Sequence, residues 1–395
     1  MIKVINRLKE LVSLAIIYIF NCLPIKHNKI FLFSYYGSQY GCSPKYITKY
    51  IVDHYPEQTF DLVWAFNDPA SKEQLIGVRK VKTMSLKYFY ELCTSKVVIT
   101  NFRTTNLFVK RKRQYYIQTW HSSLRLKQIE KDTEDTLPDN YVEMAKKDSR
   151  KCDLLLSGCS YSTDIFRRSF WYEGEIFEQG IPRNDVLFED NVHLRHKILK
   201  SLGVSSKANI ILYAPTFRKD NQVDIYNLDY EKIIEELHIR FGGNWTFLVK
   251  LHPHLISQSS ELVYGDQVID VTEYDDIQEL LGISDVLITD YSSLMFDYAL
   301  TGLPCFLYVP DVIDYLKNDR KLYFNLTDLP FYHATTINEL LLRIESFDSV
   351  DYRRRLQEFS TSIGSYERGR ATEYLLKQIT EKCFNKTKEG SHEAV

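Results

Sequence analysis

The stretch that decides the fold is residues 114–121, Gln-Tyr-Tyr-Ile-Gln-Thr-Trp-His, in which an apolar and aromatic run ends at a histidine. A short apolar run between polar residues is typical of a buried strand. Residues 245–254, Trp-Thr-Phe-Leu-Val-Lys-Leu-His-Pro-His, repeat the arrangement in the second half. His121 and His252 therefore each stand where a predicted strand ends, which is the edge of an open α/β sheet at which ligands bind.

Short apolar runs alternate with helical patterns on both sides of these two strands. In the first half we expect strands at 30–34, 60–65, 97–100, 115–119, 152–157 and 175–179, and helices at 44–54, 85–93 and 161–170. In the second half we expect strands at 210–214, 245–251, 268–271, 286–289 and 305–308, and helices at 230–240, 277–281, 292–301 and 337–344. This alternation predicts an α/β protein whose parallel sheets are covered by helices on both faces.

The length of 395 residues suggests two to three domains, since one domain takes about 150 residues. No Gly/Ser linker or low-complexity tract separates the halves, so we expect them to pack around a shared cleft. We predict an N-terminal helix at 1–24, a first Rossmann-like domain at 25–195, a second at 196–375 and a polar tail at 376–395.

The first twenty residues predict an amphipathic helix, because apolar residues recur at helical spacing and Lys3, Arg7 and Glu10 lie on another face. The apolar stretch 14–20 is too short to cross a bilayer, which takes about 20 residues. No small-residue cleavage site follows, so we expect no removed signal peptide. We expect this helix to lie in a membrane interface, with Lys26 and Lys29 near anionic lipids. The alternative is an ordinary packing helix.

Charge and cysteine content exclude several classes of function. A formal net charge of −2 gives no overall attraction to nucleic acid, although the basic run 110–113 is either a solvated turn or a contact for an anionic lipid or polymer. Seven scattered cysteines without a Cys-x-x-Cys pair favour reduced thiols in the cytosol over a disulfide framework or a zinc site. No cluster of metal ligands is visible, but Mg²⁺ held through substrate phosphates leaves no such signature.

Two further strand ends carry polar side chains suited to an anionic substrate. Residues 286–293 predict a buried strand that leads into a helix, where Asp290, Ser292 and Ser293 either cap the helix or help its free N–H groups to bind a diphosphate. Residues 212–218 end at Arg218, which is either a surface arginine or an anion ligand. The two histidines are either hydrogen-bonded core residues or groups that move protons near neutral pH.

Five motifs in sequence order resemble those of one family. They are residues 115–121, 180–185 (Gly-Ile-Pro-Arg-Asn-Asp), 213–218 (Tyr-Ala-Pro-Thr-Phe-Arg), 250–253 (Lys-Leu-His-Pro) and 288–293 (Ile-Thr-Asp-Tyr-Ser-Ser), the last with Phe296-Asp297. The chain resembles, from about Gly37 to Phe324, the CDP-glycerol glycerophosphotransferases. These enzymes build wall teichoic acids and related glycerol- or ribitol-phosphate polymers in Gram-positive bacteria.

The resemblance implies a GT-B-like architecture, in which two Rossmann-like domains face a central cleft. The nucleotide is then expected in the C-terminal domain and the acceptor on the N-terminal, membrane-facing one. Many members have Trp-His-Gly-Thr where this chain has Trp120-His121-Ser122-Ser123, and this departure leaves the details of the acceptor open. The length resembles that of the shorter, single-module members.

The implied reaction transfers glycerol-phosphate or ribitol-phosphate from a CDP-activated donor to an acceptor hydroxyl and releases CMP. By resemblance, His121 is the general base, and His252 holds the donor diphosphate together with Ser292 and Ser293. The other expected donor-binding residues are Arg218, Lys250, Asp290 and Arg320. The expected residues of the acceptor side are Trp120, Ser122, Ser123, Arg183 and Asp185. No protein metal site is expected, and Mg²⁺ would enter with the substrate phosphates.

The expected partners are CDP-glycerol or CDP-ribitol, a lipid-linked saccharide or polyol-phosphate acceptor, and the cytoplasmic face of the cell membrane, with no nucleic acid. Two alternatives stay open at this point. One is a GT-B glycosyltransferase that uses a sugar nucleotide in envelope polysaccharide synthesis. The other is a non-catalytic subunit of a polymer-assembly complex. The sequence does not separate glycerol from ribitol, or addition of one unit from polymerisation.

Overall fold

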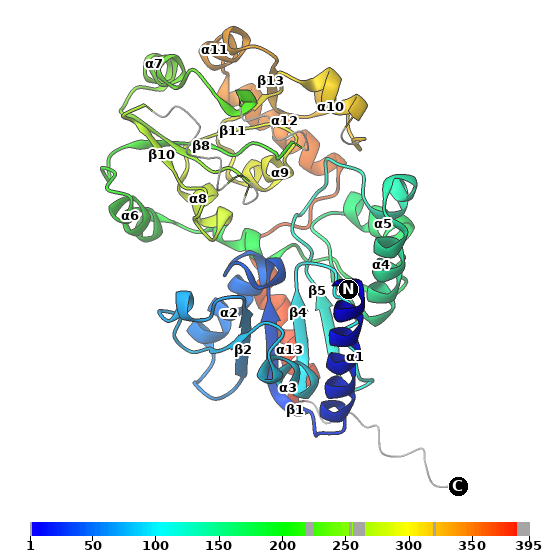
Figure 1. Cartoon of the computed structure of the whole chain (residues 1–395). Coiled ribbons are helices and arrows are strands. Elements are labelled where there is room, and N and C mark those ends of the chain that lie inside the picture. The colour runs from blue at the N-terminus through cyan, green and yellow to red at the C-terminus, as the bar shows by residue number, and fades with distance from the viewer. Residues whose placement is uncertain (1, 219–223, 253–254, 256–264, 319–320, 385–395) are drawn as a thin grey trace.

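The computed structural model describes residues 2–218, 224–252, 255, 265–318 and 321–384. It contains two β-sheets, one in each half of the chain, with helices packed around both (Figure 1). All of the strand pairs within the two sheets are parallel. The prediction of an α/β fold with parallel sheets is therefore confirmed.

The N-terminal sheet has seven strands in the order β3-β2-β1-β4-β5-β6-β7. Their bounds are β1 Lys26–Phe33, β2 Asp61–Phe66, β3 Arg79–Lys82, β4 Ser95–Thr100, β5 Tyr115–Gln118, β6 Leu154–Leu156 and β7 Glu175–Phe177. The strand order reverses between β1 and β4, so a crevice for ligands is expected beyond the carboxyl ends of these strands. β5, which leads to His121, lies next to β4 at this edge.

The C-terminal sheet repeats the arrangement with six strands in the order β10-β9-β8-β11-β12-β13. Their bounds are β8 Asn209–Tyr213, β9 Trp245–Val249, β10 Val268–Asp270, β11 Val286–Thr289, β12 Cys305–Tyr308 and β13 Tyr332–Ala334. The order reverses between β8 and β11, so the loops that follow these two strands meet at a second crevice. Edge strands β3 and β13 were not predicted.

Thirteen α-helices of the described chain accompany the sheets: α1 Ile2–Asn21, α2 Cys42–His54, α3 Leu86–Thr94, α4 Asp139–Lys151, α5 Ser160–Ser169, α6 Val192–Ser201, α7 Tyr230–Phe241, α8 Ile277–Ile283, α9 Leu294–Tyr298, α10 Val312–Asn318, α11 Ile337–Glu345, α12 Ser349–Ser362 and α13 Ala371–Phe384. The predicted helices are present within a few residues, except that 292–301 is replaced by short α9 and a 3₁₀ turn at 299–301. Helices α4, α6, α10, α12 and α13 were not predicted.

Helix α13 corrects the prediction of a polar tail from residue 376. Leu375, Leu376 and Ile379 are fully buried in the core under the N-terminal sheet, together with strands β1 and β4. The chain thus leaves the C-terminal half and returns to the N-terminal one (Figure 1). These apolar residues recur at helical spacing, and burying them holds the helix in place. Residues 385–395 lie outside the described residues, and the remaining domain bounds stay predictions.

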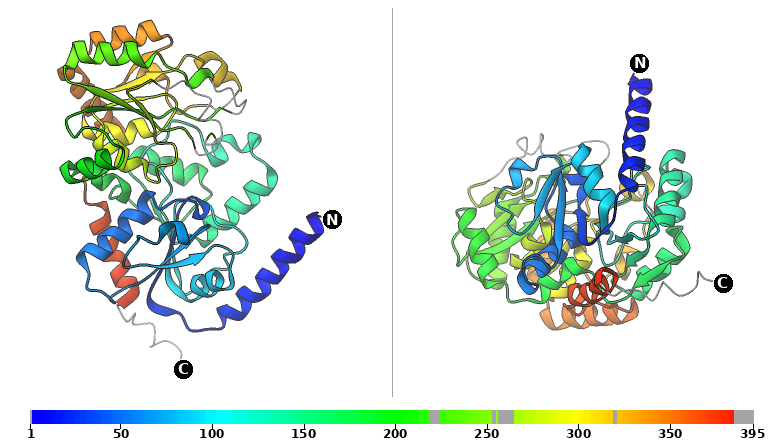
Figure 2. Two further views of the ribbon diagram at one scale, coloured as in Figure 1. Left: turned by 60° about the vertical axis from the view of Figure 1, so that its left-hand side comes forward. Right: turned by 90° about the horizontal axis from the view of Figure 1, so that it is seen from below.

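Residues Ile2–Asn21 form helix α1, and only part of it is covered by protein. Its membrane role stays a prediction. Ile17 is buried against the core that includes α3, whereas Leu11 and Ile19 are 57% and 66% exposed. Figure 2 shows the helix standing out from the N-terminal half, with the N-terminus at its far end. None of the described helices combines the length and the apolar character that a bilayer crossing requires.

The two halves meet through buried polar contacts. The guanidinium of Arg183, which follows β7, forms an ion pair with Asp297 of α9, and both side chains are almost fully buried. The ammonium of Lys45 on α2 lies 2.7 Å from a carboxylate oxygen of Asp276 at the start of α8. A more exposed pair joins Lys72 to Asp275. These contacts fix how the two sheet edges face each other.

The Arg183–Asp297 pair gives the first prediction. Asp297→Asn leaves a buried guanidinium without its counter-ion, so we expect the free energy of unfolding in urea to fall by about 3–5 kcal/mol. Asp275→Asn is the matched control, since it removes the more exposed ion pair between the same halves and should cost about 1 kcal/mol or less. Equal losses in the two variants would contradict the assigned role of the buried pair.

Candidate active site

A strained turn presents His121 at the end of β5. Trp120 has φ of 51°, in the left-handed region that bulky residues avoid at a cost of about 1–3 kcal/mol. Its backbone N–H donates to the Gln118 side-chain oxygen over 2.9 Å, and the Gln118 amide nitrogen donates to the Phe102 carbonyl over 2.7 Å. Strand β5 thus ends in a turn that buried polar groups hold in place.

The imidazole of His121 is oriented by its neighbours. It stacks on the Trp120 ring at a centroid distance of 4.6 Å, and its Nδ1 lies 3.3 Å from the Asn101 carbonyl oxygen at the end of β4. Because a carbonyl can only accept, Nδ1 carries the proton in this contact, and Nε2 is left as a proton acceptor. The histidine is therefore held in the tautomer that a base requires.

The surroundings of His121 keep it neutral. The residue is exposed at the surface, although the protein atoms around its ring desolvate the imidazole. This desolvation, followed by the charges of Arg125 and Arg183, lowers the pKa of His121 to about 3. The imidazole is thus uncharged at neutral pH, with one ring nitrogen carrying a proton and the other free to accept one.

His252 lies at the corresponding place in the C-terminal half. It follows β9 by three residues, is exposed, and contacts the Phe217 ring at a centroid distance of 5.6 Å. Lys250 is buried beside it, and its ammonium donates to the carbonyl of Thr272. Burial lowers the pKa of Lys250 to about 8. The edge formed by β8 and β9 therefore carries one accessible imidazole and one buried ammonium.

Arg218 does not present an uncompensated charge at this edge. Its guanidinium lies 2.8 Å from Asp290 and 2.7 Å from Asp311. It is 5.0 Å from each of the rings of Tyr291 and Tyr315, which stack on each other. Asp290 also accepts from the Thr216 backbone N–H over 2.8 Å. These contacts brace the loops after β8 and β11, so they favour a supporting role for both residues. Arg320 lies outside the described residues.

The serine pair is placed at the contact between the halves. The Ser293 hydroxyl accepts from the Leu126 backbone N–H over 3.3 Å, and the Ser292 hydroxyl from Leu294 N–H over 3.4 Å. Helix α9 has only five residues, so its dipole contributes little. The predicted diphosphate site therefore depends on the hydroxyl groups and neighbouring loops more than on a helix start.

Ser122 and Ser123 lie in the buried segment between His121 and Leu126. The Ser122 hydroxyl accepts from the Arg125 guanidinium, and the Ser123 carbonyl accepts from the Ser162 hydroxyl over 2.8 Å. These contacts tie the segment to α5. At Leu126 the same segment contacts Ser293 of the C-terminal half. One short stretch therefore links the two sheet edges that were predicted to bind substrate.

Asp185 is placed away from the predicted acceptor side. Its carboxylate accepts from the backbone N–H groups of Ala371 and Thr372 over 3.0 and 2.8 Å, and so caps the start of α13. Arg183, paired with Asp297, also donates to the Cys42 sulfur over 3.8 Å. Arg183 therefore joins the two halves, and Asp185 holds the start of α13.

Two buried residues near the site were not predicted. Arg125 lies four residues after His121. Glu367, in the segment that returns to α13, accepts from the Asn184 side chain over 3.0 Å and from Ile181 N–H over 3.3 Å. Burial raises the pKa of Glu367 to about 8. No local sequence pattern marks either residue, because both depend on contacts distant in sequence.

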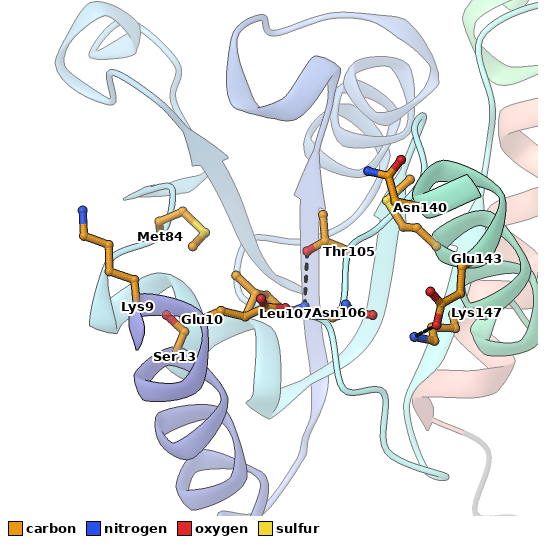
Figure 3. Close-up of a pocket in the computed structure, with 11 residues that line it drawn as sticks. Lys9, Glu10, Ser13, Met84, Thr105, Asn106, Leu107, Asn140, Glu143 and Lys147 are labelled. Atoms are coloured by element: carbon orange, nitrogen blue, oxygen red, sulfur yellow. Dashed lines mark hydrogen bonds and ion pairs between the residues drawn. The ribbon is translucent and has the colours of Figure 1, made fainter. Parts of the chain in front are cut away.

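A separate pocket of about 500 Å³ lies between α1, the loop 105–107 and α4 (Figure 3). Lys9, Glu10 and Ser13 line it from α1, and Glu143 and Lys147 from α4. It contains none of the predicted site residues. Within the described ranges, no three His, Cys, Asp or Glu side chains are placed to share a metal ion. A site without protein-bound metal stays a prediction.

Comparison with known proteins agrees with this geometry. The pattern of the family described as CDP-glycerol:poly(glycerophosphate) glycerophosphotransferase matches residues 16–381. The teichoic acid poly(glycerol phosphate) polymerase of Staphylococcus epidermidis is 34% identical over 89% of this chain. The teichoic acid glycerol-phosphate transferase of Staphylococcus aureus is 31% identical over 95% of this chain. A structure of a variant of the wall teichoic acid polymerase TagF, soaked with CDPG, is 33% identical and superposes with a TM-score of 0.78 over 91% of this chain and 90% of that one.

The relatives differ in length. This chain spans 50% of the S. epidermidis polymerase and 99% of the S. aureus transferase. The family match covers most of the chain, including both sheets and both histidines. The chain therefore belongs to the CDP-glycerol:poly(glycerophosphate) glycerophosphotransferase family.

Proposed function

We propose that the protein transfers glycerol-phosphate, or ribitol-phosphate, from a CDP-activated donor to a hydroxyl of a lipid-linked acceptor. The observation that carries the proposal is the placement of His121. It is a neutral, oriented imidazole at one sheet edge, and its own segment contacts Ser293 at the opposite edge. Family membership and the names of the relatives support the choice of donor and product.

The reaction needs a proton acceptor next to the attacking group. An acceptor hydroxyl attacks the β-phosphorus of the CDP-polyol, and a new phosphorus–oxygen bond forms. The hydroxyl proton passes to Nε2 of His121, the ring nitrogen that does not face Asn101. The bond between the β-phosphorus and the bridging oxygen breaks, and CMP leaves with the electron pair. Such a base contributes typically about 10²–10⁴-fold to the rate.

The donor would bind in the C-terminal half. His252 stands at the carboxyl end of β9, and Ser292 and Ser293 lie beyond β11. These groups can donate hydrogen bonds to diphosphate oxygens, and a protonated His252 would also offset the charge on departing CMP. Mg²⁺ bound to the substrate phosphates would supply further charge. A requirement for it stays a prediction.

The finer architecture belongs to the same proposal. Two sheets with the same order reversal face each other across the Arg183–Asp297 contact, as expected for a GT-B-like enzyme with donor and acceptor on opposite sides. Helix α1 would lie in the membrane interface on the acceptor side. The enzyme would then work at the cytoplasmic face of the membrane on a lipid-linked saccharide or polyol-phosphate acceptor.

The roles of the two histidines give a second prediction. His121→Ala should lower turnover, measured as CMP release, by at least about 10²-fold, since the base is lost. The same variant should keep its thermal stabilisation by CDP-glycerol. His252→Ala should weaken that stabilisation. The assignment is wrong if His252→Ala loses only turnover while His121→Ala abolishes donor binding.

The choice of nucleotide gives a third prediction. A ligand that binds the folded state raises the unfolding temperature, and the rise grows with the ratio of ligand concentration to Kd. We expect CDP-glycerol or CDP-ribitol to raise it at lower concentration than a UDP-sugar. Stabilisation by a UDP-sugar alone would instead favour the glycosyltransferase alternative.

The exposed side of α1 gives a fourth prediction. A chain carrying both Leu11→Asp and Ile19→Asp should bind vesicles with anionic lipids at least about tenfold more weakly than the wild type, because two apolar groups no longer enter the interface. Ile313→Asp on α10 is the control, since this side chain is 83% exposed and lies in the C-terminal half. Co-sedimentation measures the effect, and equal binding by all three proteins would refute the membrane role of α1.

A further inference from the structure

Four arginine side chains of the described chain are buried, and one of them differs from the rest. Three are within ion-pair distance of carboxylates: Arg103 of Glu130 and Asp148, Arg183 of Asp297, and Arg218 of Asp290 and Asp311. Arg125 is 3% exposed and has no carboxylate at that distance among the described residues. A buried charge without a counter-ion costs several kcal/mol, so its counter-ion is expected to come from outside the protein.

The contacts of Arg125 do not replace a counter-ion. Its guanidinium donates to the hydroxyl and, over 3.2 Å, to the carbonyl of Ser122, and lies 5.2 and 5.3 Å from the rings of Trp120 and Phe166. Its Nε–H has no acceptor among the described residues, which is also true of the Nε–H groups of Arg103 and Arg183. Arg103 approaches the same indole at 5.8 Å and forms ion pairs with two carboxylates, those of Glu130 and Asp148. The fold thus compensates one arginine beside Trp120 and leaves the other uncompensated.

The electrostatics of the two arginines differ in the same way. Burial, followed by the charge of Arg183, lowers the pKa of Arg125 to about 9. Burial acts to lower the pKa of Arg103 as well, but the charges of Glu130 and Asp148 outweigh the effect of burial. The pKa of Arg103 is therefore raised. Arg125 still carries its charge at neutral pH. It is therefore a buried cation without a carboxylate at ion-pair distance, and Asp297, whose charge also acts on it, is already paired with Arg183.

The position of Arg125 identifies which anion would reach it. In the sequence it lies between His121, the proposed base, and Leu126, whose N–H donates to Ser293. Two further buried N–H donors, the indole of Trp120 and the side-chain amide of Asn101, also lack an acceptor within the part of the chain that the structure describes. Phosphate oxygens accept several hydrogen bonds at once and match a guanidinium well.

We propose that Arg125 binds a phosphate of the acceptor, next to the hydroxyl that attacks the donor. This inference rests on the proposed function. It defines the preferred acceptor as one that already carries a phosphate close to its reacting hydroxyl, such as a polyol-phosphate end, rather than a plain saccharide. Donor phosphate is the other source of the same chemistry, and the experiments below separate the two.

The first experiment measures ligand binding and does not depend on turnover. Glycerol 3-phosphate should raise the unfolding temperature of the full chain, whereas glycerol at the same concentration should not. Arg125→Gln should need about 10- to 100-fold more glycerol 3-phosphate for the same rise, since one charge-assisted contact is lost. Stabilisation by CDP-glycerol should be unchanged. Equal responses of the two proteins to glycerol 3-phosphate, or loss of the response to CDP-glycerol instead, would overturn the proposal.

The unfolding temperature without ligand shows whether Arg125 binds phosphate or instead supports the fold. Arg125→Gln should unfold within about 4 °C of the wild type, because the substitution removes an uncompensated charge. Arg103→Gln is the matched control: it leaves two carboxylates unpaired, should unfold at a clearly lower temperature, and should keep the response to glycerol 3-phosphate. A chain with Arg125→Gln that does not fold, or loses more stability than Arg103→Gln, would contradict the proposal.

A turnover experiment tests the same site with substrates. Arg125→Gln should raise the KM for a polyol-phosphate-ended acceptor at least about tenfold and leave the KM for CDP-glycerol unchanged, and Arg125→Lys should recover part of the loss. A raised KM for CDP-glycerol alone would refute the acceptor assignment. If the wild type releases no CMP, the proposed function fails, while the binding experiment still decides whether Arg125 holds a phosphate.

Discussion

The buried ion pair between Arg183 and Asp297 is the contact on which the arrangement of the site depends. Each half carries a parallel sheet whose strand order reverses once, and each reversal creates a crevice at the carboxyl ends of the strands. A reaction between two substrates needs both crevices to face the same space. The pair, with Lys45 and Asp276 beside it, holds the halves in that relation. The site is thus a property of the interface as much as of either sheet.

Some of the buried arginines are paired with carboxylates, but the positive charge near His121 is not fully balanced. Arg218 and Arg103 are compensated by carboxylates, so they support loops. Around His121, desolvation and then the positive charges of Arg125 and Arg183 lower the pKa and keep the imidazole neutral. A substrate that brings phosphate groups would supply the missing negative charge. Near His121 the negative charge that balances the arginines would therefore come from the substrates, whereas Arg103 and Arg218 are balanced by the protein's own carboxylates.

Much of the fold could be predicted from the sequence, because buried parallel strands are short apolar runs and both histidines follow such runs. Strand β3 was missed because three of its four residues are Arg or Lys and only Val81 is buried. The return of α13 to the first sheet, the pairing of Arg218 with Asp311 and the capping role of Asp185 could not be predicted, since each joins residues far apart in the chain. The uncompensated charge of Arg125 is likewise visible only once its neighbours are known.

The central claim is that the facing sheet edges bring a CDP-polyol and an acceptor hydroxyl together beside His121. The most direct test incubates the wild-type chain with CDP-glycerol or CDP-ribitol, with and without a lipid-linked acceptor, and measures CMP together with the mass of the product. The account predicts that CMP appears only with acceptor and that each CMP corresponds to one polyol-phosphate added. Absence of CMP with both donors, or CMP release without any product, would contradict it.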